Sequence, residues 1–130
     1  MQTHLYTDGS CSPNPGRGGW GFVVVENDKK IHDGCGGEAE TTNNRMEMTA
    51  IIKGLEYLKN SSTITIFTDS SYVVNSMTQN WKRNKNQDLW KLLEEGIKSK
   101  NIIWKWVRGH NGDMWNEYVD KLANKGREAK

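Results

Sequence analysis

Residues 44–68 read NRMEMTAIIKGLEYLKNSSTITIFT, and the spacing of apolar residues changes within this stretch. Up to about Lys59 the apolar residues recur every three or four positions, which predicts a helix. Residues 63–68 are rich in Thr, Ile and Phe, which predicts a short strand. A helix that leads into a strand favours a sheet covered by helices.

The sequence on either side extends this pattern into an α/β fold. Before the helix, three β-rich segments are joined by a Gly-rich loop from Ser12 to Gly21 and by a turn at Asn27-Asp28, which predicts an antiparallel meander. After residue 68 come two helices, a strand and a last helix. This order predicts a mixed sheet with helices on its faces. The expected strands are 3–8, 20–25, 31–37, 63–68 and 102–107, and the later helices are 71–78, 88–99 and 113–127.

Composition limits the class of protein. The chain has 130 residues, of which 35% are hydrophobic and 26% charged, with a mean hydropathy of -0.82 and six Trp. No apolar run approaches the roughly 18 residues of a membrane span, and no signal peptide opens the chain. We expect residues 1–130 to form a single cytoplasmic domain that does not contact a membrane.

Cysteine and charge patterns leave alternatives open. Cys11 and Cys35 are too few for a disulfide framework and lack zinc-site spacing, so reduced thiols are expected, although one bridge between them stays possible. Residues 1–80 contain 6 basic and 9 acidic side chains, whereas residues 81–130 contain 12 and 7. A basic half favours a polyanionic partner, but this asymmetry is also common by chance.

Three carboxylates occupy positions that a packed core would not favour. Glu47 falls on the apolar stripe of its helix, where burial is costly without a partner. Asp8 and Asp69 each follow a predicted strand, and ligands gather beyond the carboxyl ends of strands in such sheets. Each residue also has a structural alternative: Asp69 as a helix cap, Asp8 as a turn residue before Gly9, and Glu47 turned toward water.

The last helix adds two polar side chains to this set. Asn116 and Asp120 are four residues apart on one face, and Asp120 borders the apolar stripe. Upstream, His110 lies between glycines, where a surface role is the ordinary alternative, and Asp113 is the expected N-cap. Three Asp and one Glu favour Mg²⁺ over zinc, and paired Mg²⁺ ions serve phosphodiester cleavage. The sequence thus favours phosphoryl transfer on a polyanion.

Several short blocks of residues together form a familiar pattern. They are Tyr6-Thr7-Asp8-Gly9-Ser10, Asn14-Pro15-Gly16 with Gly18-Gly19, Thr41 to Glu47, Thr68-Asp69-Ser70 with Tyr72-Val73, and Gly109-His110-Asn111-Gly112 with Asn116-Glu117 and Asp120. In this order the blocks resemble type 1 ribonuclease H, in a compact form without the long basic handle insertion. The similarity covers nearly the whole chain, and the run TTNNRME at residues 41–47 is its most specific part.

The resemblance implies a fold, a reaction and a metal site. The implied fold is the ribonuclease H-like five-stranded mixed sheet, with strands one to three antiparallel and helices on both faces. The implied reaction is endonucleolytic hydrolysis of the RNA strand of RNA–DNA hybrids, which leaves 5′-phosphate and 3′-hydroxyl ends. It needs two Mg²⁺ ions, for which Mn²⁺ can substitute. The implied metal ligands are Asp8, Glu47, Asp69 and Asp120, with His110 as a further catalytic residue.

The resemblance also implies residues that bind the hybrid. Asn14, Asn43 and Asn44 would read the minor groove on the RNA side, since an amide both donates to and accepts from a 2′-hydroxyl. Turn chemistry is the alternative for Asn14 and Asn43. Thr42 and Asn86 would hold a phosphate of the DNA strand, and Asn116 would also contact substrate.

The interval between the two middle helices is short, at residues 79–88. Trp81, Lys82, Arg83 and Lys85 within it would form a reduced contact surface for the DNA strand, and a solvated turn is the alternative. We therefore expect a monomer that binds hybrids more weakly, and loses affinity more steeply with salt, than relatives with the handle.

Two other functions compete with the endonuclease. One is a hybrid-binding module that does not cut, which the occupied acidic positions and His110 disfavour. The other is a related nuclease acting on another nucleic acid, which the Asn14, Asn43 and Asn44 set disfavours.

Overall fold

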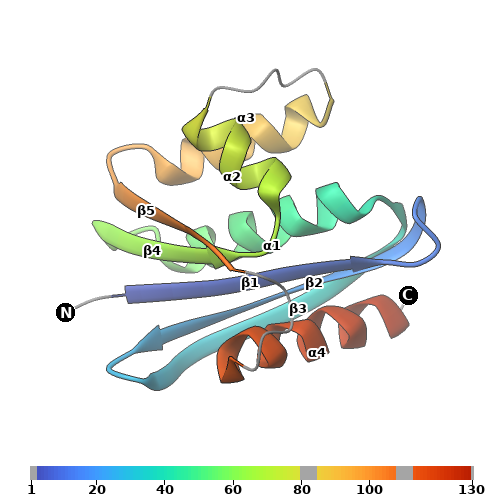
Figure 1. Ribbon diagram of the computed structural model, residues 1–130, viewed down its shortest axis with the longest axis horizontal. Coiled ribbons are helices and arrows are strands. Elements are labelled where there is room, and N and C mark those ends of the chain that lie inside the picture. The colour runs from blue at the N-terminus through green and yellow to red at the C-terminus, as the bar shows by residue number, and fades with distance from the viewer. Residues whose placement is uncertain (1–2, 80–84, 108–112, 130) are drawn as a thin grey trace.

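The computed structural model describes residues 3–79, 85–107 and 113–129, which form one five-stranded sheet with four helices (Figure 1). The strand order is β3-β2-β1-β4-β5. The strands are β1 (Thr3–Cys11), β2 (Gly16–Glu26), β3 (Lys29–Thr41), β4 (Thr63–Thr68) and β5 (Asn101–Trp106), and the helices are α1 (Asn43–Tyr57), α2 (Ser71–Thr78), α3 (Gln87–Ile97) and α4 (Met114–Glu128).

The sheet is mixed, as predicted. β1, β2 and β3 pair antiparallel, whereas β4 runs parallel to β1 and to β5. β1 pairs with β2 along its whole length but with β4 only as far as Tyr6, opposite Phe67. Beyond Tyr6, β1 continues to Cys11 while β4 ends. The two strands therefore separate into a fork at the centre of the sheet.

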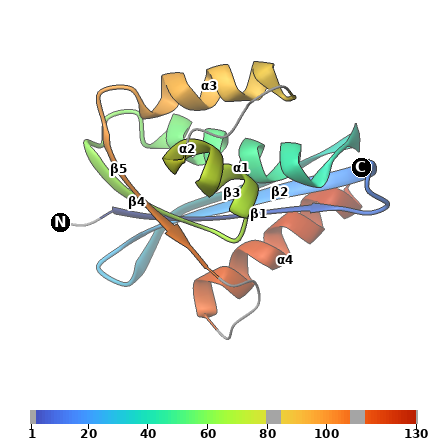
Figure 2. The ribbon, with the colours of Figure 1, turned by 45° about the horizontal axis from the view of Figure 1, so that its top comes forward.

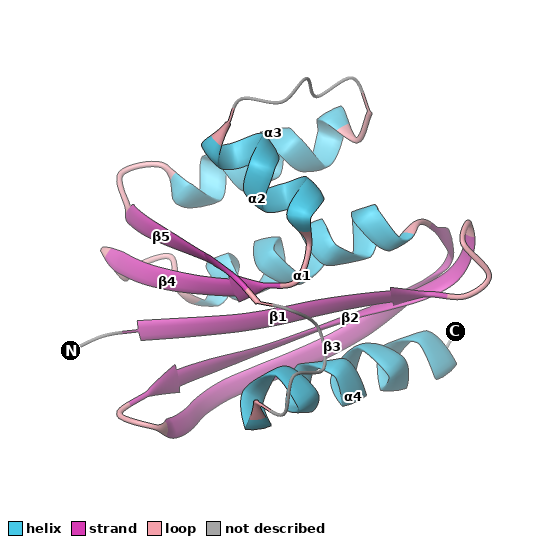
Figure 3. Cartoon of the chain, in the orientation of Figure 1, coloured by secondary structure: helices cyan, strands magenta, loops and turns pink. Residues whose placement is uncertain are grey.

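Helices cover both faces of the sheet, which confirms the predicted architecture (Figures 2 and 3). α1 packs on one face and α3 packs on α1, whereas α4 packs on β1, β2 and β3 from the opposite face. Side chains of β1 alternate between these two cores. Leu5 joins the α1 core with Ile51 and Ile64, and Tyr6 joins the α4 core with Val23 and Val119.

The Gly-rich segment is mostly strand, so its prediction as a loop was wrong. Only residues 12–15 lie between β1 and β2, and Gly18, Gly19 and Gly21 belong to β2. A Cβ atom at Gly21 would lie 2.6 Å from Cβ of Leu122, and one at Gly19 would lie 2.8 Å from the carbonyl carbon of Gly126. These glycines let the backbone of α4 lie directly on the sheet.

The two cysteines are too far apart to form a bridge. Cys11 lies on β1 and Cys35 on β3, with β2 between them. Two strand spacings amount to about 9.5 Å, and disulfides need Cα atoms less than about 7 Å apart. Both thiols are free.

Lys100 ties the end of α1 to the start of β5. Its Nζ donates hydrogen bonds to the carbonyl oxygens of Leu58 at 3.0 Å, Lys59 at 2.8 Å and Ser61 at 2.7 Å. A cation is favourable at a helix C-terminus, where carbonyl groups lack partners. No helix within the described parts of the chain is long and apolar enough to cross a membrane.

Candidate active site at the fork between β1 and β4

Three carboxylates meet where β1 and β4 separate. Asp8, Glu47 and Asp69, here called the carboxylate trio, each offer an oxygen within 4.8 Å of the others. Only 7% of Asp8 and 4% of Glu47 is exposed. Asp8 was expected at the end of its strand but lies inside β1. Parallel pairing with β4 ends at Tyr6, so Asp8 still lies just beyond the last paired residue, where β1 and β4 separate.

Local structure explains how Glu47 reaches Asp8. Thr42 caps α1, since its Oγ1 accepts a hydrogen bond from the backbone N–H of Arg45 at 3.2 Å. A Cβ atom at Gly9 would lie 2.6 Å from the carbonyl carbon of Met46, and closer still to the backbone nitrogen of Glu47. Only glycine lets α1 come this near to β1, so Gly9 serves helix packing rather than a turn.

Asp69 is free of the capping role that was its alternative. Ser70 caps α2, with its Oγ accepting from the backbone N–H of Val73 at 3.2 Å. The backbone oxygen of Asp69 accepts a hydrogen bond of 3.2 Å from Nε1 of Trp106, at the end of β5. These contacts hold the backbone around Asp69 and leave its carboxylate for the trio.

The electrostatics of the trio favour the binding of a positively charged ion. Burial, followed by the charge of Asp69, raises the pKa of Asp8 to about 8, although the N–H of Gly9 donates to its Oδ1 at 2.9 Å. Burial, followed by the charges of Asp8 and Asp69, raises the pKa of Glu47 well above its ordinary value. Within the described chain, Glu47 Oε1 and Asp69 Oδ1 are buried without a hydrogen-bond partner. Unpartnered carboxylate oxygens in a common pocket fit a divalent cation with a preference for oxygen.

Asp120 lies beside the trio on α4. Its charge and a hydrogen bond both raise the pKa of Asp8, which places the two side chains in contact. It is not among the three residues that share the 4.8 Å spacing. Asp113 caps α4 as predicted, accepting from the backbone N–H groups of Trp115 at 2.8 Å and Asn116 at 3.1 Å. Asn116 lies on α4 one turn before Asp120.

The asparagines of the first two motifs lie together at the start of α1. Asn14 Oδ1 accepts a hydrogen bond of 3.1 Å from the backbone N–H of Asn43. This bond holds the 12–15 connection against the helix, so Asn14 has a structural contact as well as an exposed position. Asn44 is exposed on the first turn of α1.

The Asn86 side chain is held by partners that were not among the residues predicted from sequence. Arg45 Nη1 donates to Asn86 Oδ1 at 3.2 Å, and Asn86 Nδ2 donates to the Tyr72 hydroxyl at 3.4 Å. Arg45 also binds both carboxylate oxygens of Asp88, at 3.1 and 2.9 Å, and lowers the pKa of Asp88 to about 2. Trp90 Nε1 donates to the same Tyr72 hydroxyl at 3.2 Å. Arg45 was visible in the TTNNRME run, but its partners lie about 40 residues away.

The other predicted substrate residues divide into two groups. Lys85 is exposed just before Asn86. The segments 80–84 and 108–112 lie outside the described residues, and they contain Trp81, Lys82, Arg83 and His110. α2 ends at Thr78 and α3 begins at Gln87, so the interval between them is short, as predicted.

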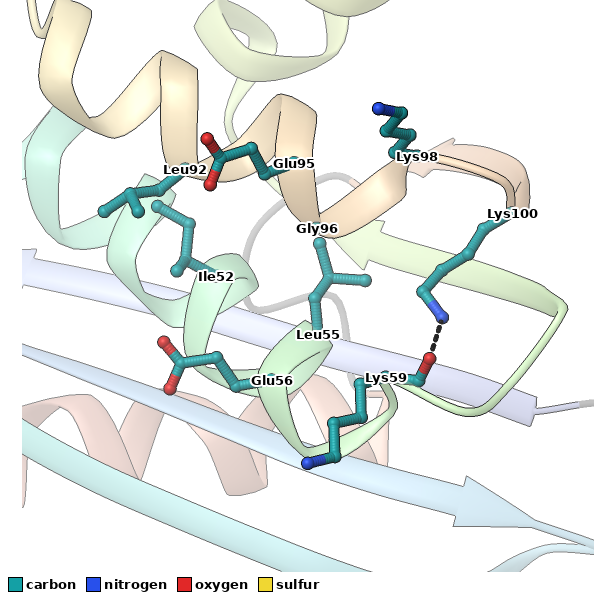
Figure 4. A pocket seen from close by; sticks show the side chains of 9 residues that line it. All are labelled: Ile52, Leu55, Glu56, Lys59, Leu92, Glu95, Gly96, Lys98 and Lys100. Carbon is teal, nitrogen blue, oxygen red and sulfur yellow. Dashed lines mark hydrogen bonds between the residues drawn. The ribbon is translucent and has the colours of Figure 1, made fainter.

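A cavity of about 480 Å³ lies elsewhere, between α1 and α3 (Figure 4). Ile52, Leu55 and Leu92 form its apolar part, and Glu and Lys side chains surround it. Leu92 on α3 is 49% exposed and faces this cavity. None of the lining residues belongs to the trio, so the cavity is separate from the candidate active site.

Comparisons with known proteins agree with this fold and show its family. The sequence model of the RNase H family matches residues 1–128. The chain is 46% identical over 144 residues to Ribonuclease H of Bordetella pertussis, covering 99% of this chain and 91% of that protein. It is 46% identical over 143 residues to Ribonuclease H of Legionella pneumophila, covering 98% of each.

Solved structures show the same arrangement. RNase H1 from the halophilic archaeon Halobacterium salinarum NRC-1 superposes with a TM-score of 0.84 at 27% identity, over 100% of both chains. LC11-RNase H1, solved in complex with an RNA/DNA hybrid, superposes with a TM-score of 0.86 at 22% identity over 98% of both chains, a similarity of fold. The fold and acidic fork define a nuclease of the ribonuclease H type. The chain belongs to the RNase H family, in a compact form without the long handle.

Proposed function

We propose that this protein is an endonuclease that hydrolyses the RNA strand of RNA–DNA hybrids and leaves 5′-phosphate and 3′-hydroxyl ends. The observation that supports this most directly is the buried carboxylate trio, with ligand atoms within 4.8 Å of one another. Carboxylate oxygens suit Mg²⁺, and two such ions are a common apparatus for phosphodiester cleavage. Membership of the RNase H family supports the same reaction.

Asp8, Glu47, Asp69 and Asp120 would together hold two Mg²⁺ ions, or Mn²⁺ as a substitute. When bound, the ions would supply a nucleophilic water at neutral pH and neutralise charge on the leaving oxygen. Asp8 is suited to a shared position, because it interacts with Asp120 and also offers an oxygen within 4.8 Å of oxygens of Glu47 and Asp69. In the reaction water adds to phosphorus, the bond to the 3′ oxygen breaks, and that oxygen takes up a proton. By resemblance, His110 would move a proton or assist release of the product.

The chain's polar residues would orient the hybrid across the fork. Asn43 and Asn44 lie on the first turn of α1, about one turn before Glu47, and Asn14 is hydrogen-bonded to the backbone N–H of Asn43. Amide groups at this place could read 2′-hydroxyls of the RNA strand. Asn116 lies one turn before Asp120 and would face the same strand. Thr42 and Asn86 would hold a DNA-strand phosphate, and the Arg45 contact supports this by fixing the Asn86 carboxamide close to the start of α1.

The short interval between α2 and α3 would contact the DNA strand outside this pocket. Lys85 lies next to Asn86, and Trp81, Lys82 and Arg83 would extend the surface. With fewer phosphate contacts than a long basic insertion provides, we expect weaker hybrid binding than in relatives that have one. The salt dependence should then be shallower, because each phosphate contact adds to the salt slope, so the steeper loss with salt expected from the sequence is not proposed here. We also propose that the working form is a cytoplasmic monomer, and sedimentation of the purified protein would check the monomer.

The decisive experiment is cleavage of an end-labelled RNA–DNA hybrid beside duplex DNA, duplex RNA and single-stranded RNA, with Mg²⁺ and with EDTA. We expect metal-dependent cuts inside the RNA of the hybrid alone. Asp69→Asn should abolish them without loss of fold, whereas Asp28→Asn, at an exposed turn residue with φ of 63°, should cut normally. Binding without cutting would indicate a non-catalytic module, and cutting of DNA would contradict the proposed role of the asparagines.

A further inference from the structure

A polar cluster joins β1 to α4 next to the carboxylates. Arg127 Nη1 donates a hydrogen bond to Ser10 Oγ at 2.6 Å, and Ser10 Oγ donates in turn to Asn124 Oδ1 at 3.0 Å. In the sequence Ser10 is 114 positions from Asn124 and 117 positions from Arg127, so the fold alone brings Ser10 to the other two. Their roles are not explained by the metal site or by the asparagines at the start of α1.

The Ser10–Asn124–Arg127 cluster lies beyond Asp8 along β1 and beyond Asp120 along α4. Ser10 is two residues after Asp8, so both side chains lie on the α4 face of β1. Asn124 and Arg127 follow Asp120 by one and two turns of α4. Seven helical residues span about 10 Å. In Figures 1 and 2 this end of α4 lies near the end of β1 that leads into the β1–β2 connection.

The charge of Arg127 is not neutralised within the described chain. Arg45 is paired with Asp88, Lys30 with Asp33 and Lys53 with Glu56, each within 4.0 Å. Within residues 3–79, 85–107 and 113–129, Arg127 forms no such ion pair, and its guanidinium donates instead to the neutral Ser10 hydroxyl. A guanidinium that is oriented by a neutral partner keeps its charge and most of its donors for an external anion.

The position of the cluster distinguishes the two strands of a bound duplex. Thr42 and Asn86, the proposed site for a DNA-strand phosphate, are the N-cap residues of α1 and α3 and are joined through Arg45, on the α1 face of the sheet. The Ser10–Asn124–Arg127 cluster lies on the opposite face, with the carboxylates of Asp8 and Asp120. Successive phosphates advance about 3.4 Å along a duplex axis, so a span of about 10 Å covers roughly three nucleotides of one strand.

We infer that Arg127, oriented by Ser10 and Asn124, binds a backbone phosphate of the strand that is cleaved, within about three nucleotides of the scissile bond. This inference rests on the proposed function for the identity of the nucleic acid. Arg127 is a substrate-binding residue and does not touch the reacting atoms. Bidentate binding of a phosphate explains the use of Arg, which Lys cannot reproduce.

The test compares Arg127→Gln and Arg127→Lys with Lys125→Gln, which removes an exposed positive charge from the same turn of α4. We expect Arg127→Gln to raise KM for the hybrid about tenfold with kcat almost unchanged, and to reduce the slope of log KM against log salt by about one phosphate contact. Arg127→Lys should recover only part of the affinity, and Lys125→Gln should match wild type. Circular dichroism and Tm show that each variant is folded.

Neutral methylphosphonate linkages placed one at a time in the RNA strand locate the contact. One position within about three nucleotides of the cut should weaken binding by wild type but not by Arg127→Gln. Equal KM and equal salt slope for Arg127→Gln and wild type would overturn the inference while leaving the proposed function intact. If wild type cuts no hybrid, fluorescence anisotropy separates the two claims: an Arg127-dependent salt slope for any duplex keeps the phosphate site, and no binding to any nucleic acid removes both.

Discussion

Gly9 and Glu47 approach so closely that no side chain fits between strand β1 and helix α1. A Cβ atom on Gly9 would overlap the backbone nitrogen of Glu47 and lie 2.6 Å from the carbonyl carbon of Met46. We therefore expect Gly9→Ala to push the start of α1 outward. The predicted cost is about 1–3 kcal/mol in the free energy of unfolding, measured in urea.

The same substitution should slow cleavage by roughly tenfold to a hundredfold, because it moves Glu47 away from Asp8. Gly96→Ala is the matched control, since its Cβ would meet side-chain atoms of Leu55, the nearest at 3.1 Å, and not a backbone. A Gly9→Ala variant that cuts hybrid at the wild-type rate would show that the close packing does not position Glu47.

Asp8→Asn should stabilise the metal-free protein, and increasingly so as pH rises. The pKa of Asp8 is raised from 3.8 to about 8 by burial and by Asp69, so the folded state holds a proton that the unfolded state releases. The stability from this proton is fully present below about pH 4 and is lost as pH rises toward about 8. An Asn side chain has no charge to bury.

Thermal unfolding in EDTA at several pH values measures this difference. The Tm advantage of Asp8→Asn over wild type should grow between about pH 5 and about pH 8. At the higher pH it should correspond to about 1–3 kcal/mol or more in the free energy of unfolding. Added Mg²⁺ should raise the Tm of wild type more than that of the variant. A gap that stays constant with pH would mean that Asp8 is ionised in the folded, metal-free protein.

Lys100→Met should destabilise the protein without changing its chemistry. Lys100 donates to three carbonyl oxygens at and just after the end of α1, and Lys100→Met loses all three of these charge-assisted hydrogen bonds. We expect a loss of about 1–2 kcal/mol in the free energy of unfolding and an unchanged kcat. Lys98→Met, at an exposed neighbouring lysine, should be neutral. Equal stability of the two variants would mean that water replaces the Lys100 contacts at no cost.

Arg45→Met should weaken binding of the hybrid by releasing Asn86. Arg45 joins Asn86 and Asp88 to the start of α1, so its removal leaves the Asn86 side chain with its Tyr72 hydrogen bond but without this link to α1. KM should rise roughly tenfold, with kcat changed much less. Asp88→Asn, which loses the ion pair but keeps a hydrogen-bond acceptor, should have a smaller effect. If Arg45→Met left KM unchanged, Asn86 would not depend on this contact for its role.

Local patterns were enough to predict several elements and the direction of Glu47. β4 and α2 begin and end where expected, because alternation and a capping serine are properties of a few neighbouring residues. Glu47 points inward, as its place on the apolar stripe indicated. The site lies at the predicted strand ends in space, although Asp8 is inside a longer β1.

Long-range contacts account for what the sequence did not reveal. Gly19 and Gly21 resemble loop residues until α4, about 100 residues later, lies on them. The partners of Arg45 and of Arg127 are likewise distant in sequence, so no local pattern predicts them. The residue type of Asp69 does not distinguish a helix cap from a metal ligand. In the structure Ser70 caps α2, so Asp69 is not the cap.

The hydrogen bond between Trp106 and Asp69 gives the protein an internal optical reporter. The indole is 51% exposed and its N–H contacts the backbone of a carboxylate residue in the trio. A bound divalent cation would be the largest local charge, so its arrival should alter the fluorescence of this indole. The spectrum of Trp106→Phe provides the background from the other tryptophans. Ion affinity can then be titrated without nucleic acid, which separates loading of the metal site from turnover.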